Sequence, residues 1–271
     1  MGVILVEKNN PRERLYLEDL GLHVETAEEL SYLILKSPPL FLENFVGEAF
    51  FVFVERGALR PALARELRGC RGENARNEEV LARFLARSGY ASPRQQSIFL
   101  QDAKEYLALP RERAELKRGD IFFTLQKYGK AVGAYERALA DDRLDRALKS
   151  RLLDREGAAL ANLFLAERAF DCFRTAYALG RDRNIIKRMY FLAESETDET
   201  LRARFRRELP EVRDSEKERW DAQLREVTAR AAKGREAKEV AAIFAEQDET
   251  KRRAMEEKVI AQWREEYRSM V

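Results

Sequence analysis

Apolar residues recur every three or four positions along most of this chain, which is the spacing of one face of an α-helix. Two such stripes cover residues 78–87 and 93–109 and flank a short polar segment, 88–92. Ser92 is a typical N-cap, and Pro93 is a favourable first helical residue. The pattern therefore predicts a chain built mainly of amphipathic helices.

The N-terminal segment, 1–75, gives a more mixed pattern. Residues 3–6 favour a short strand that pairs with Leu15–Leu17. Thr26 and Glu29 form a capping box ahead of a helix that Pro38 and Pro39 end. Residues 50–54 have strand propensity, but the apolar spacing and the absence of an internal turn signal favour a helix. We therefore expect two further helices, over residues 42–56 and about 59–67.

The clearest linker is residues 69–77, Gly-Cys-Arg-Gly-Glu-Asn-Ala-Arg-Asn, so a boundary is expected near residue 75. The sequence is very polar from Pro210 onward. We therefore expect the chain to have three parts: an N-terminal, mostly helical segment over 1–75, a helical region over 76–209 and a charged helical tail over 210–271.

Composition supports a helical protein. Charged residues make up 36% of the 271 residues, whereas Gly (13) and Pro (7) are scarce. Sandwiches and barrels need many Gly- and Pro-containing turns, so this balance argues against them. The net charge of +2 argues against a globally basic nucleic-acid binder.

Two distant cysteines, Cys70 and Cys172, and one histidine, His23, fit neither a zinc site nor a disulfide framework. The most apolar stretch, residues 30–54, is interrupted by charges and prolines, so no transmembrane helix is expected. Residues 3–6 are too few for the apolar part of a signal peptide. We expect a soluble cytoplasmic protein without a metal or cofactor.

The strongest signal is an internal repeat between residues 112 and 183. Two glycines, Gly119 and Gly157, are each followed by the same residue types at offsets of 3, 12, 16 and 19. The first set is Phe122, Ala131, Tyr135 and Ala138, and the second is Leu160, Ala169, Phe173 and Ala176. In the tetratricopeptide repeat, which these offsets resemble, the small residues let two antiparallel helices approach and the larger ones fill the space between them.

This pattern resembles the tetratricopeptide repeat, a helix–turn–helix unit of about 34 residues. The resemblance covers 112–183 and extends weakly to 78–109 and 184–209. Glu115 and Arg118 stand where the family often has Trp and Leu, and the terminal Pro is absent. The resemblance implies an all-α, tetratricopeptide-like α-solenoid with the N-terminal segment and charged tail described above. The alternative is an ordinary helical bundle whose small residues mark close crossings.

In that family, the first helix of each repeat lines a concave groove. Placing the two glycines in register assigns these groove positions to Arg113, Lys117, Asp120, Thr124, Arg151, Asp154, Arg155 and Asn162. Arginine binds carboxylates with two parallel hydrogen bonds, so an acidic or C-terminal peptide is the expected ligand. The family's carboxylate clamp is not carried over, because Leu116 and Asp120 replace its Lys and Asn. The alternative is that these arginines pair with Asp120, Asp154 and other nearby acids.

The tail carries short apolar stripes on charged helices, among them Trp220 to Ala231 and Met255 to Tyr267. They are too short to indicate a coiled coil. Either a helical hairpin packs on the end of the repeats, or an arm extends and binds a partner or a second copy. Trp263 and Tyr267 are aromatics of the kind that anchor interfaces.

No catalytic set stands out. Asp141 and Asp142 fall in an expected loop, and residues 69–72 lack the Gly-Lys-Ser/Thr end of a phosphate loop. We therefore expect a non-enzymatic adaptor or scaffold that binds a partner protein or peptide in the groove. The alternatives are a nucleic-acid-associated regulator, using helices 78–87 and 93–107, and a structural protein that oligomerises through its C-terminal helices.

Overall fold

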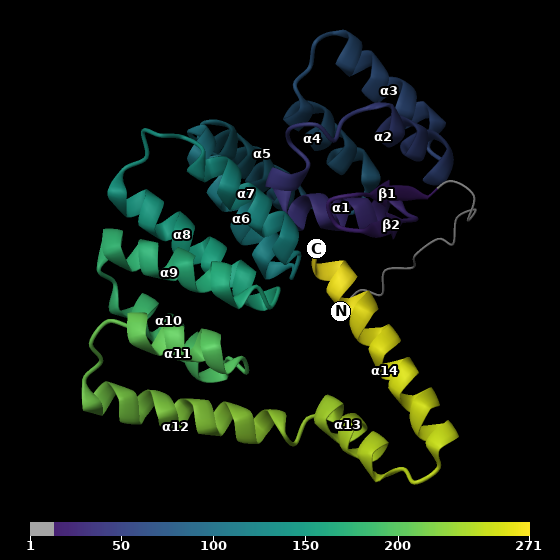
Figure 1. Cartoon of the computed structure of the whole chain (residues 1–271). Helices are drawn as coiled ribbons and strands as arrows, with labels where there is room; N and C mark the ends of the chain where they lie inside the picture. The colour runs from purple at the N-terminus through teal and green to yellow at the C-terminus, as the bar shows by residue number, and fades with distance from the viewer. Residues whose placement is uncertain (1–13) are drawn as a thin grey trace. The chain divides into compact units, whose positions relative to one another are not determined.

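The computed structural model describes residues 14–271, and their regular secondary structure is almost entirely helical (Figure 1). They form two compact units, one ending at Ile121 and the other spanning Phe122–Val271. The expected strand over residues 3–6 lies outside the described residues. Leu15–Leu17 is a strand, β1, and it pairs antiparallel with β2, Leu22–Val24.

The helices of the N-terminal unit follow this hairpin in chain order. They are α1 (Ala27–Lys36), the 3₁₀ turn η1 (Pro38–Leu40), α2 (Glu48–Val52), the π-helical turn η2 (Phe53–Gly57), α3 (Pro61–Gly72), α4 (Asn77–Ser88), α5 (Pro93–Leu107) and α6 (Arg111–Thr124), whose last residues enter the second unit.

Local capping signals account for two of these helices. The Thr26 side chain accepts from the Glu29 amide at 3.1 Å, which completes the capping box of α1. Ser92 caps α5 in the same way with Gln95. Both expected helix starts are confirmed.

Two boundaries differ from the sequence-based expectation. The expected helix over 42–56 begins only at Glu48, and Asn77 Nδ2 donates to the Leu42 carbonyl at 2.9 Å, so that carbonyl is satisfied outside a helix. The helix expected over 59–67 continues through Gly69 to Gly72. Burial of Leu63, Ala64 and Leu67 outweighs the low helix propensity of glycine there.

One apolar cluster fills the N-terminal unit and runs from Leu15 to Tyr106. Phe50 and Phe84, from either side of residue 75, lie 5.5 Å apart between ring centroids, edge to face. The expected boundary near residue 75 therefore falls within a continuous core, and the compact unit extends to Ile121.

The second unit continues as a series of helices. They are α7 (Tyr128–Leu139), α8 (Arg146–Asn162), α9 (Ala166–Gly180), α10 (Arg183–Ser195), α11 (Glu199–Glu208), α12 (Asp214–Ala231), α13 (Arg235–Ala245) and α14 (Glu249–Met270). From α7 to α11 each helix packs on the next, as Figure 1 shows for α8 to α11.

The turns before α7 and α9 have the same geometry. We call Phe122–Lys127 the first repeat turn and Leu160–Leu165 the second. Each contains a residue with a left-handed backbone, Gln126 (φ 59°) and Phe164 (φ 60°), and these two are separated by the interval of the sequence repeat. The next residue in each turn donates its amide to the turn's first carbonyl, at 2.9 Å and 3.0 Å. The sequence repeat is thus also a repeat of backbone conformation.

The small residues of the repeat stand at close contacts. A Cβ on Gly157 would lie 2.8 Å from the Phe173 ring, so α8 and α9 approach too closely for any side chain there. The residues at the shared offsets, from Phe122 to Ala176, are buried. The α10–α11 pair departs from this geometry, because its turn has extended residues at Glu196 and Asp198 instead of a left-handed one.

The C-terminal arm, α12–α14, packs on the rest of the second unit mainly at its start. Trp220 of α12 is buried against Ile186 and Tyr190 of α10. Tyr190 also donates a hydrogen bond to Asp221 of α12. Further along, Val227 and Phe244 are exposed, and α14 has no buried residue. The arm therefore combines a packed first half of α12 with a largely exposed remainder.

Candidate functional site

The expected groove residues lie on α6 in the first unit and on α8 in the second. On α6, Arg113, Lys117 and Asp120 follow a four–three spacing, which places them on one face of the helix. Arg113 and Lys117 are exposed, whereas Asp120 is half-buried. The two cations are thus presented to solvent from a common face of α6.

A comparable stripe runs along α8. Arg151, Arg155 and Asn162 lie on one stripe, with Arg151 and Asn162 exposed and Arg155 half-buried. Asn162 donates its side-chain amide to the Ala158 carbonyl of its own helix at 2.9 Å. This bond orients Asn162 along α8.

Asp154 is engaged by the neighbouring helix. It forms an ion pair with Arg188 of α10, which ties two successive first helices together. The alternative interpretation is that nearby acids pair with the groove arginines. Asp154 does pair with a cation, but this cation lies on α10 rather than on α8. A carboxylate already paired in this way is a weak ligand for a basic partner.

Arg188 was missed from the sequence. Continuing the repeat interval by one more unit from Arg151 leads to Met189, the neighbour of Arg188, and not to Arg188 itself. The sequence pattern of α10 and α11 was too degenerate to suggest that step.

The buried Glu156 and the half-buried Cys172 form a polar pair within the repeat. Burial raises the pKa of Cys172 to about 12, and the neighbouring Glu156 carboxyl adds to this effect. Burial likewise raises the pKa of Glu156, with a further contribution from Glu136. At neutral pH the Cys172 thiol is therefore protonated and poorly suited to act as a nucleophile.

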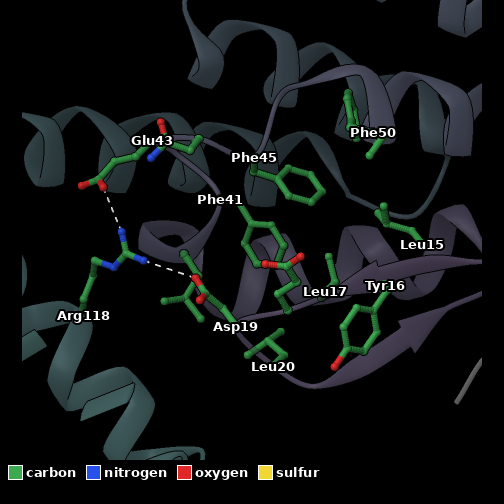
Figure 2. Close-up of a pocket in the computed structure, with 14 residues that line it drawn as sticks. Leu15, Tyr16, Leu17, Asp19, Leu20, Phe41, Glu43, Phe45, Phe50 and Arg118 are labelled. Atoms are coloured by element: carbon green, nitrogen blue, oxygen red, sulfur yellow. Dashed lines mark hydrogen bonds and ion pairs between the residues drawn. The ribbon is translucent and has the colours of Figure 1, made fainter. Parts of the chain in front are cut away.

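The N-terminal unit contains a pocket of about 320 Å³ (Figure 2). The β1–β2 hairpin and the segment Leu40–Phe50 line it, and Arg118 of α6 lies at one side. Figure 2 shows the Arg118 guanidinium between the carboxylates of Glu43 and Asp19, at 2.8 Å and 3.3 Å.

These contacts give Arg118 a structural role. Its side chain is only 15% exposed, and it joins the hairpin to the segment that carries Glu43. Tyr106 donates its hydroxyl to the same Glu43 at 3.3 Å, and burial raises the tyrosine pKa well above its usual value. The guanidinium pairs with both carboxylates, and most of the remaining pocket lining is apolar.

Within residues 14–271, no three acidic, cysteine or histidine side chains gather as a metal-binding group. No helix in that part of the chain combines the length and apolar character needed to cross a membrane. Comparison of the chain with models of known families, with characterised proteins and with solved structures finds no match.

Proposed function

We propose that this chain is a tetratricopeptide-like repeat protein that binds an acidic peptide segment of a partner protein, without catalysis or a cofactor. The observation that carries the proposal is the pair of repeat turns with matching backbone geometry, spaced at the interval of the sequence repeat and each leading into a packed helix. Repeated helix pairs of this kind present the first helix of each unit as an extended surface.

The chemistry of that surface supports an acidic ligand. Arg151 is exposed on α8, and the half-buried Arg155 lies one turn further on the same stripe. Arg188 of α10 lies beside this face through its ion pair with Asp154. A guanidinium can bind a carboxylate through two parallel hydrogen bonds, so a peptide with spaced acidic side chains matches the stripe.

The test is a pull-down from native cell lysate with mass spectrometry. The wild type is compared with Arg151→Glu/Arg155→Glu, which reverses the charge of the stripe. Lys149→Glu is the matched control, because Lys149 is exposed on the same helix but two residues from Arg151, and so faces a different side. Circular dichroism verifies that each variant is folded.

The proposal expects a partner that the wild type and Lys149→Glu retain and the double variant loses. Equal capture by all three proteins would exclude the α8 stripe as the site. Capture of nucleic acid in place of protein, with steep salt dependence, would favour the nucleic-acid alternative.

A further inference from the structure

The helix α14 has 22 residues, and none of them is buried. Helices in proteins are held mainly by packing of an apolar face, so a helix that buries nothing needs other contacts to keep its position. Such contacts are present at each end of α14. The start of α14 packs on α13, and its end lies against the first repeat turn.

The contact at the end of α14 is specific. Lys127 Nζ donates to the Ser269 carbonyl at 2.8 Å. Two residues further on, a Cβ on Gly129 would lie 2.8 Å from the Val271 Cα and closer still to its carbonyl oxygen. Gly129 lies in the first turn of α7 and has no left-handed backbone that would require glycine. A larger residue at position 129 would therefore collide with Val271.

Between its two ends, α14 faces the second repeat turn across a cavity. Ile260, Trp263 and Tyr267 line one side of this cavity of about 750 Å³, and Phe164 lines it from the turn. Phe164 is 82% exposed, although an apolar side chain of that size is normally buried. The helix thus contacts the first repeat turn and shares a cavity with the second.

We propose that the last turn of α14 is a latch that docks on the first repeat turn. The latch holds two apolar walls, the Trp263–Tyr267 face and Phe164, on either side of the cavity. Because the docked helix buries none of its residues, release of the latch requires little free energy. This inference is independent of the α8 stripe.

The test uses Gly129→Ala in the full chain and hydrogen exchange read by mass spectrometry. Helix propensity alone predicts slower exchange in α7 and no effect on α14, since alanine is the better helix former. The latch predicts the reverse for α14: the added methyl group displaces Val271, and amides of residues 249–270 exchange about fivefold faster or more.

Two further variants isolate the cause. Gly133→Ala is the matched control, because the nearest group its Cβ would meet is the Arg137 side chain, at 3.4 Å. Exchange in α14 should not change in this variant. In a chain that lacks residues 269–271, exchange in α14 should already be fast, and Gly129→Ala should add nothing.

Two results would overturn the proposal. One is unchanged exchange of α14 in Gly129→Ala within the full chain. The other is an equal acceleration by Gly129→Ala with and without residues 269–271, which would trace the effect to α7 itself.

Discussion

The packed part of the chain, from Leu15 to Phe205, and the C-terminal arm, α12–α14, are both helical for different physical reasons. The packed part buries continuous aromatic and aliphatic clusters, with Leu30, Phe84 and Phe170 fully inaccessible. Trp220 and Ile243 are the buried side chains of the arm.

Charge pairs take the place of burial in the arm. Arg230 pairs with Glu226, Arg235 with Glu239 and Arg253 with Glu249, each one helical turn apart and at 2.6–2.8 Å. Exposed pairs of this kind contribute little free energy. Helical content is therefore a poor guide to stability here: similar helices should differ widely in how readily they open.

The largest expected difference in stability is between the substitutions of two phenylalanines. Phe84→Ala removes a side chain with no exposed surface, and we expect a loss of about 3–5 kcal/mol in the free energy of unfolding. Phe244→Ala makes the same chemical change on the arm, where the ring is 82% exposed, and should cost less than about 0.5 kcal/mol. Urea unfolding measures both. Equal losses would contradict the distinction between the packed part and the arm.

Substitutions of two glycines compare a close-packed position with an open one inside the packed part. Gly157→Ala would place a methyl group 2.8 Å from the Phe173 ring, so we expect a loss of about 1–3 kcal/mol. Gly69→Ala meets nothing within 4 Å on α3 and should stabilise the chain by about 0.5–1 kcal/mol, because alanine favours helix. Thermal unfolding of both variants checks the opposite signs.

The buried Glu156 predicts a pH dependence. Its pKa is raised in the folded chain, so the charged form disfavours folding above that pKa, and the penalty fades as pH falls towards the unfolded value of 4.5. Glu156→Gln should therefore be more stable than the wild type at pH 7, with the difference shrinking towards pH 4.5. Urea midpoints of both proteins at several pH values measure this. A difference that grows on acidification would have the wrong sign.

The smallest effect concerns the arm. Arg253→Ala removes an ion pair whose side chains are 72% and 64% exposed. We expect no measurable change in the urea midpoint, and only a small loss of helical ellipticity at low salt. A clear shift of the midpoint would mean that surface charge contributes more to the arm than we infer.

The parts of the fold that depend on local sequence could be predicted. The caps at Thr26 and Ser92, the helix pairs after residue 77 and the repeat at Gly119 and Gly157 follow from short-range patterns, and the structure has helices at each place. The name of the repeat family and its groove stay predictions.

The parts of the fold that depend on contacts between residues distant in sequence could not be predicted. A core shared by Phe50 and Phe84 crosses the glycine-containing segment that looked like a linker. The ion pair of Asp154 with Arg188 joins two helices whose sequences show no common template. The left-handed residues of the repeat turns are Gln126 and Phe164, neither of which is the glycine that usually marks such a position.

The order of helix contacts has a consequence for how the chain reaches its folded state. From α7 to α11 each helix packs on its neighbour in sequence, so loops close over short distances and these helices should form within milliseconds. The N-terminal unit joins residues far apart in sequence: Tyr106 bonds to Glu43, and Arg118 reaches Asp19 across 99 positions. During synthesis, that unit must wait until α6 has left the ribosome, whereas the helices that follow can pack as they emerge.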